Sequence, residues 1–139
     1  MNDFSHLAEL QVSDKKTKKF TFDGVKGEPY FMVLSATEAN KEYFNDALKQ
    51  QRKNNIKKMS AVSIKKARDR DRQLYPKHVI KDGGNLYDVK GDLIPFSKEV
   101  ANQFLDQLPD HIFDDLREYC LEVENFVDAE DEIEDLIKN

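Results

Sequence analysis

The densest run of potentially functional side chains lies between Lys49 and Arg72. This stretch carries ten Lys and Arg residues against two Asp, a local charge of +8, whereas the whole chain has a net charge of −5. Clustered bases can neutralise nucleic-acid phosphates or contact an acidic protein surface. Because no aromatic residue between Leu48 and Leu74 is available to stack on bases, the pattern favours an acidic protein partner. The bases that we predict to contact a partner are Lys57, Lys58, Lys65, Lys66, Arg68, Arg70 and Arg72.

The opposite charge gathers at the C-terminal end of the sequence. Residues 106–139 carry thirteen acids against two bases, a local charge of −11. The acids of residues 128–139 have some likeness to a calcium loop, but Ile133 interrupts them and no Gly stands at the sixth position. We predict an acidic helix or tail there without a metal ion. Its apolar side chains either dock on a partner protein or fold back on the domain: Ile133, Leu136 and Ile137.

The other chemically capable residues form no catalytic or metal-binding pattern. His6, His78 and His111 are not spaced as metal ligands, and no base lies near the lone Cys120, which we predict to be a buried thiol. Gly83–Gly84 lacks the Lys and Ser or Thr of a phosphate-binding loop, so it predicts a turn. The sequence therefore predicts a protein that is not an enzyme, with no cofactor and no metal site.

Turn residues predict a hairpin in the second half of the chain. Its strands would be Leu86–Val89 and Leu93–Phe96, and Gly91 can take the positive φ that a tight connection needs.

Two helices are predicted to follow this hairpin. Ser97 stands at an N-cap position ahead of apolar residues at three- and four-residue spacing, and Pro109 ends that helix. Asp110 is predicted to cap the next helix, whose apolar stripe runs from Ile112 to Val123.

The first half of the chain predicts an arm, a hairpin and more helix. Residues 1–17 hold apolar positions too sparse to define an element, and residues 20–22 and 30–34 predict the two strands of a hairpin. Thr37 is predicted to cap a helix. The basic stretch keeps some helical spacing, with a break near residues 60–63.

Composition and pattern together predict an α+β fold in a single domain. Hydrophobic residues make up 39% and charged residues 35% of the 139 residues. No run approaches the roughly 20 apolar residues of a membrane span, and no signal peptide is visible, so we expect a cytoplasmic protein. The expected domain is mostly helical with short antiparallel β-hairpins: an N-terminal arm at 1–17, a body at 18–127, and an acidic C-terminal helix or tail at 128–139.

Four runs of residues carry a resemblance to a known family. They are Gly91–Ser97, Leu108–Asp110, Phe113–Asp114 and Glu124–Phe126, with weaker support from Ala36–Asn40. These runs resemble the C-terminal half of tail assembly chaperones of long-tailed, siphovirus-like bacteriophages.

The resemblance implies a non-catalytic protein of the host cytoplasm. Such a chaperone binds the apolar tape measure protein and helps recruit major tail subunits around it. Two alternatives remain open: a nucleic-acid-binding phage or regulatory protein that uses residues 49–72, and a structural neck or tail-completion subunit. The opposite charges of the two segments also predict self-association, in which apolar contacts supply the affinity.

Overall fold

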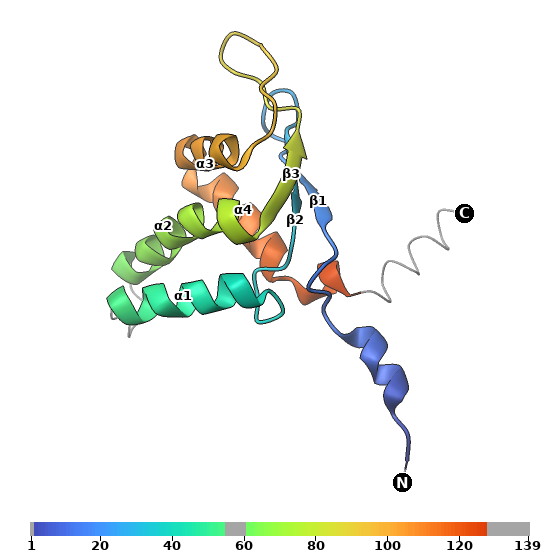
Figure 1. Ribbon diagram of the computed structural model, residues 1–139. Coiled ribbons are helices and arrows are strands. Elements are labelled where there is room, and N and C mark those ends of the chain that lie inside the picture. Colours follow the sequence, from blue (N-terminus) through green and yellow to red (C-terminus); the bar gives the residue numbers. More distant parts are fainter. Residues whose placement is uncertain (1, 55–60, 128–139) are drawn as a thin grey trace, which may run out of the picture.

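The computed structural model describes residues 2–54 and 61–127, and its α-helices lie on one side of a small sheet (Figure 1). This arrangement confirms the predicted α+β fold. The strands are β1 (Lys18–Thr21), β2 (Tyr30–Val33) and β3 (Ile80–Gly84). The α-helices are α1 (Lys41–Asn54), α2 (Ala61–His78), α3 (Lys98–Gln107) and α4 (Asp110–Leu121), and two 3₁₀ helices are η1 (Ser5–Leu10) and η2 (Val123–Phe126).

The sheet is antiparallel, with β2 between β1 and β3. Phe31 in β2 pairs with Phe20 in β1 and with Gly83 in β3. The predicted hairpin of residues 20–22 and 30–34 is confirmed as β1 and β2, which pair through four residues each. Its connection closes with a hydrogen bond from Phe22 N to Pro29 O (2.8 Å).

The third strand contains the glycine pair, so the predicted turn at Gly83–Gly84 is wrong. A Cβ atom at Gly83 would lie 2.8 Å from Phe31 Cδ1 and 2.9 Å from Phe96 Cδ2. Only a residue without a side chain lets β3 come this close to both aromatic rings. Gly83 therefore serves sheet packing at this position.

The predicted hairpin of residues 86–96 exists in a reduced form. It contains one isolated bridge, between Tyr87 and Leu93, in place of two strands. Ile94 N donates to Leu86 O (2.7 Å), and Gly91 has the expected positive φ of 89°. The connection is thus a projecting loop, drawn in yellow at the top of Figure 1.

One predicted helix cap is confirmed and another is wrong. Ser97 Oγ accepts a hydrogen bond from Val100 N (3.0 Å) at the start of α3. At the start of α1 the accepting side chain belongs to Asn40, whose Oδ1 atom takes the bond from Tyr43 N (3.2 Å). Thr37, the predicted cap, lies before the helix and accepts from Ala39 N instead.

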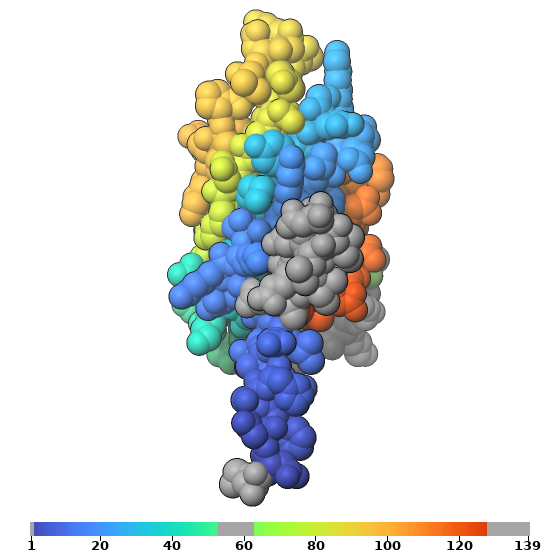
Figure 2. All heavy atoms as spheres, turned by 90° about the vertical axis from the view of Figure 1, so that its right-hand side faces the viewer, coloured from blue at the N-terminus to red at the C-terminus, as the bar shows by residue number. Residues whose placement is uncertain are grey.

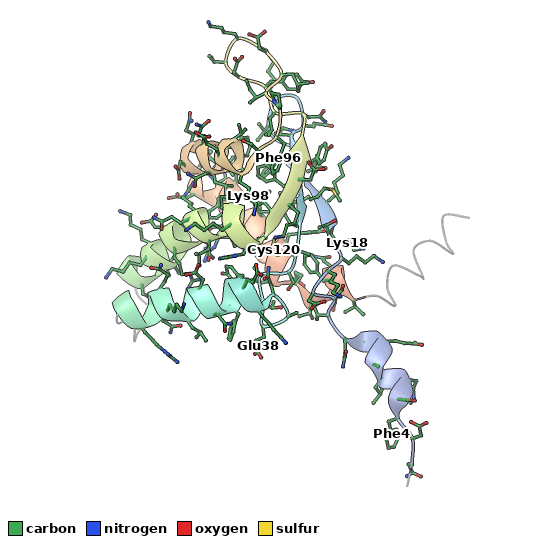
Figure 3. The ribbon with its side chains drawn as sticks, viewed as in Figure 1. Phe4, Lys18, Glu38, Phe96, Lys98 and Cys120 are labelled. Carbon is green, nitrogen blue, oxygen red and sulfur yellow. The ribbon has the colours of Figure 1, made fainter. Side chains whose placement is uncertain are left out.

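The core fills the space between the sheet and helices α2, α3 and α4. Phe31 makes edge contacts with Phe22 and Phe104, at centroid distances of 5.5 and 5.4 Å. Leu116 and Cys120 from α4 are fully buried in the same core. Figure 3 shows Cys120 inside the body, which confirms a buried thiol, and burial raises its pKa so that it remains protonated.

None of the helices in the described part of the chain has the length and apolar character that crossing a membrane requires.

The packing of α4 predicts a large difference between two leucines of the same helix. Leu116 is fully buried, so Leu116→Ala should lower the free energy of unfolding by about 2 to 5 kcal/mol through lost burial and a cavity. Leu121 is 56% exposed, so Leu121→Ala is the matched control and should change it by less than about 0.5 kcal/mol. Urea unfolding measures both. Equal stabilities of the two variants would contradict this orientation of α4.

Candidate partner-binding surface

A buried carboxylate on α2 holds three helices together. The side chain of Asp71 is 4% exposed. It accepts hydrogen bonds from Tyr43 Oη in α1 (2.7 Å), from Arg117 Nε in α4 (2.8 Å) and from the neighbouring Arg70 Nε (3.1 Å). A buried charge is tolerated only when it is paired and hydrogen-bonded, and Asp71 has all these partners. The position of α4 relative to α1 and α2 is therefore fixed at this carboxylate.

The tyrosine in this cluster stays a hydrogen-bond donor. Burial raises the pKa of the Tyr43 phenol well above its usual value, and the adjacent Asp71 charge acts in the same direction. The hydroxyl therefore remains protonated and continues to donate to Asp71 at physiological pH.

Two acids of α4, Asp114 and Asp110, pair with arginines of α2. Arg68 contacts both carboxylate oxygens of Asp114 (3.0 and 2.8 Å), and Arg117 also donates to Asp114 (3.1 Å). Arg72 pairs with Asp110 (2.6 Å). The prediction of Asp110 as a helix cap is wrong, because it is the first residue of α4 and makes no capping bond. Its carboxylate binds the arginines of α2 instead.

These ion pairs show which of the predicted partner-binding bases already have an acidic partner within the chain. Arg68 and Arg72 pair with α4, and Arg70 pairs with Asp71, so much of their charge is compensated within the chain. Less positive charge is left for a nucleic acid, and Lys65 and Lys66 are exposed on α2. The remaining predicted contact residues lie outside the described part of the chain, and their role stays a prediction: Lys57, Lys58, Ile133, Leu136 and Ile137.

The sequence contained a signal for these ion pairs. Arg68 and Arg72 are four residues apart, as are Asp110 and Asp114. Residues at this spacing lie on one face of a helix, so the two helices present a basic and an acidic face of equal length. Their pairing could have been proposed from the sequence.

Beyond the ion pairs, two exposed apolar residues lie among acids, one at the last position of α4 and one at the first position of η2. Leu121 and Val123 are 56% and 48% exposed. Val123 was predicted on the buried stripe, but α4 ends at Leu121 and the chain is extended at Glu122, so the helical period is lost before Val123. A hollow of about 410 Å³ lies over this region. We call it the α4-end surface; it is lined by Asp114, Arg117, Glu118, Leu121, Glu122 and Val123.

The rim of the α4-end surface carries three acids and one base: Asp114 pairs with Arg117, and Glu118 and Glu122 leave the rim negatively charged. The Arg68 guanidinium lowers the pKa of the Asp114 carboxyl below its usual value, so this acid is ionised at neutral pH. Glu118 and Glu122 are exposed beside it. An apolar pair with an acidic rim matches an amphipathic helix that has apolar anchors and basic flanks.

Comparison with known families covers this region. A family model described as YdaY prophage protein matches residues 35–139, which include the whole ion-pair cluster and the α4-end surface. The chain belongs to the YdaY prophage protein family. This YdaY-family chain is therefore a phage-derived protein. No match was found among curated proteins or among solved structures. The arm and the β1–β2 hairpin precede the matched range.

The buried carboxylate predicts a marked loss of stability on its neutralisation. Asp71→Asn in this YdaY-family protein leaves Arg70 without the charged partner it has here and leaves Arg117 with Asp114 alone, and breaking a buried pair costs about 3 to 5 kcal/mol. We expect about 3 kcal/mol, the lower end, because both arginine side chains are 18% exposed. Asp69→Asn removes the same charge from an exposed position of α2 and should cost less than about 0.5 kcal/mol. Urea unfolding at neutral pH compares the two; similar losses would contradict the role of Asp71.

The paired acid on α4 predicts a pH-dependent stability. The folded-state pKa of the Asp114 carboxyl lies below its usual 3.8. Its contribution to the free energy of unfolding is therefore fully present above pH 3.8 and is lost as the pH falls through the folded-state pKa. Because its side chain is 39% exposed, Asp114→Asn should cost no more than about 1 kcal/mol at pH 7. This difference from wild type should shrink as the pH falls below 3.8 and through the lower folded-state pKa. Asp115→Asn, an exposed neighbour, is the control in the same pH series of urea unfolding. A difference that persists in acid would disprove the linkage.

Proposed function

We propose that this protein is a tail assembly chaperone that binds the phage tape measure protein in the host cytoplasm and helps recruit major tail subunits, without catalytic turnover. Membership of a prophage protein family supplies the phage origin. The resemblance of residues 91–126 to tail assembly chaperones supplies the specific role. The structural observation that carries the proposal is the α4-end surface, with Leu121 and Val123 exposed among acids.

The physical reason for such a surface is protection of apolar segments. A long helical tape measure protein exposes apolar stripes before tail tube subunits cover it, and large exposed apolar patches aggregate. A small apolar surface with a charged rim covers part of a stripe and stays soluble when it is released. The hydrogen bonds to Asp71 hold α4 in place. They contribute to binding because a preorganised surface loses less entropy when it binds.

The segment after Val127 fits the same proposal at the sequence level. Ile133, Leu136 and Ile137 stand at i, i+3 and i+4, the spacing of anchors in helix-in-groove recognition. In the sequence, the acids among them belong to the same acidic stretch, residues 106–139, as Glu118 and Glu122. We propose that this segment adds anchors to the α4-end surface when the tape measure protein is bound.

The proposal is tested by co-purification with the tape measure protein of the same prophage. The double variant Leu121→Ser, Val123→Ser removes both exposed anchors and should weaken binding by about tenfold or more, with an unchanged melting temperature. Ile64→Ser is the matched control, because Ile64 is also an exposed apolar residue (44%) but lies on α2 and does not line this surface. It should bind as wild type does.

Charge reversal gives a second arm of this experiment. Glu118→Lys with Glu122→Lys should weaken the complex most at low ionic strength, since salt screens exposed charges. Retained binding by the apolar double variant would reject the α4-end surface as the binding site. A wild-type protein that does not bind the tape measure protein at all would reject the proposed function itself.

A further inference from the structure

The sheet has one face that no α-helix in the described part of the chain covers. The α-helices lie on its other side in Figure 1, and Figure 2, which looks at the uncovered side, shows the blue and cyan atoms of the β1–β2 hairpin at the surface. Side chains alternate along a strand, and in β2 the buried ones are Phe31 and Val33. Tyr30 and Met32 therefore point to the uncovered face, where both are partly exposed and do not pack against the core.

The strand register places two residues of β1 beside this apolar pair. Lys19 is opposite Met32, and Thr21 is opposite Tyr30. Lys19 Nζ lies 4.3 Å from the centroid of the Tyr30 ring. A Cβ atom at Gly84 would be 2.6 Å from Tyr30 Oη, so the tip of the ring lies against the backbone of β3. We call the side chains of Lys19, Thr21, Tyr30 and Met32 the outer sheet face; it is an apolar surface that carries a cation.

Positive charge gathers at the end of the outer sheet face where the arm begins. Residues 13–19 contain four Lys and one Asp. In β3 the charges balance, because Lys81 stands next to Asp82, whose carboxylate also accepts a hydrogen bond from Gly83 N (2.8 Å). The β1–β2 connection, residues 22–29, adds two acids and one base at the opposite end. The arm end of the face therefore favours an acidic ligand.

The last described residue of the chain lies beside this face. The Tyr119 ring contacts Phe20 of β1 and Phe126 of η2, at centroid distances of 5.3 and 6.0 Å. Val12, at the base of the arm, forms a β-bridge with Val127. The segment that follows Val127 therefore begins next to β1 and its lysines.

This segment has the composition and length that the outer sheet face favours. Residues 128–139 contain six acids and one Lys, and their three large apolar residues stand at i, i+3 and i+4 with acids on both sides of the stripe. Ile137 is ten residues after Val127, about 15 Å in a helix, and the four residues of β1 span about 13 Å. The segment is long enough to lay its apolar stripe along the face.

We propose that residues 128–139 dock on the outer sheet face of their own chain in the free protein. The apolar stripe packs on Tyr30 and Met32, and the acids beside it face the lysines of residues 13–19. The chain connection gives this contact an effective concentration of about 1 mM or more, which a second copy does not reach at ordinary protein concentrations. The α4-end surface is acidic, so charge disfavours it as the docking site of this segment.

This docking covers two apolar surfaces at once, one on the sheet and one on the segment. It belongs to the free protein, so it does not rest on the proposed tape measure binding. A partner that uses the apolar stripe of the segment must first displace it from the sheet. The contact is therefore an autoinhibitory one, which keeps the stripe covered until a partner competes for it.

Disulfide trapping tests the position of the segment. Thr21→Cys with Asn139→Cys places one thiol on the outer sheet face and one at the end of the segment, and Cys120 is fully buried and does not compete. In dilute protein under a mild oxidant, this pair should close an intramolecular disulfide at least about tenfold faster than two control pairs. Glu118→Cys with Asn139→Cys reports on the α4-end surface, and Ser5→Cys with Asn139→Cys reports on the arm. Mass spectrometry identifies the linked residues.

Charge reversal separates docking from mere proximity. Added to the first pair, Lys15→Glu with Lys19→Glu should slow closure about fivefold or more at low ionic strength, and the milder Lys15→Gln with Lys19→Gln should slow it less. Lys65→Glu with Lys66→Glu makes the same change of charge at exposed positions of α2 and should leave the rate unchanged. Unchanged melting temperatures confirm the fold of each variant.

Three outcomes would overturn the proposal. They are equal closure rates for the three cysteine pairs, a disulfide that forms mainly between two copies, and a closure rate that does not respond to the charge of residues 15 and 19. None of these measurements involves the tape measure protein, so their failure is distinct from a failure of the proposed function, which co-purification reports.

Discussion

The Asp71 carboxylate is the interaction on which the helical part of the structure depends. A single buried charge accepts bonds from α1, from α4 and from its own helix, so the three helices have one shared reference point. Apolar packing alone tolerates sliding of helices, because it is not directional. The hydrogen bonds to Asp71 have fixed geometry, and they specify which face of α4 is buried and which is left to solvent.

The ion pairs between α2 and α4 explain how charge is distributed over the molecule. Along the sequence a basic segment and an acidic segment are separated, but in the fold Arg68 and Arg72 lie against Asp114 and Asp110. Arg72 Nη1 also donates to Leu105 O, which adds α3 to the cluster. The opposite charges of the two segments thus partly pair with each other inside the fold. The exposed acids at the end of α4, Glu118 and Glu122, give the α4-end surface its negative charge.

Local features were predictable from the sequence where a short run of residues determines them. The β1–β2 hairpin, the Ser97 cap and the burial of Cys120 each follow from neighbouring residues. Features that depend on residues far apart in the sequence were not predicted correctly. Gly83 is in a strand because of the rings of Phe31 and Phe96.

The same reason applies to the start of α1 and to the candidate surface. Asn40 replaces Thr37 as the cap because its Nδ2 atom also donates to His78 O (2.8 Å), a contact between the start of α1 and the end of α2. The exposure of Val123 depends on the exact residue at which α4 ends, and sequence patterns define helix ends poorly.

The central position of β2 has a consequence for how the chain folds. β2 pairs with β1 through a short connection, but its pairing with β3 joins Tyr30 to Gly84 and must close the long intervening segment that contains α1 and α2. Contacts between such distant residues form slowly, because chain entropy is lost before they become favourable. During synthesis the β1–β2 hairpin emerges first, and Phe22 and Phe31 have no core to enter until β3 and α3 follow. A protein that we propose to shield the apolar surfaces of others therefore exposes its own for part of its synthesis.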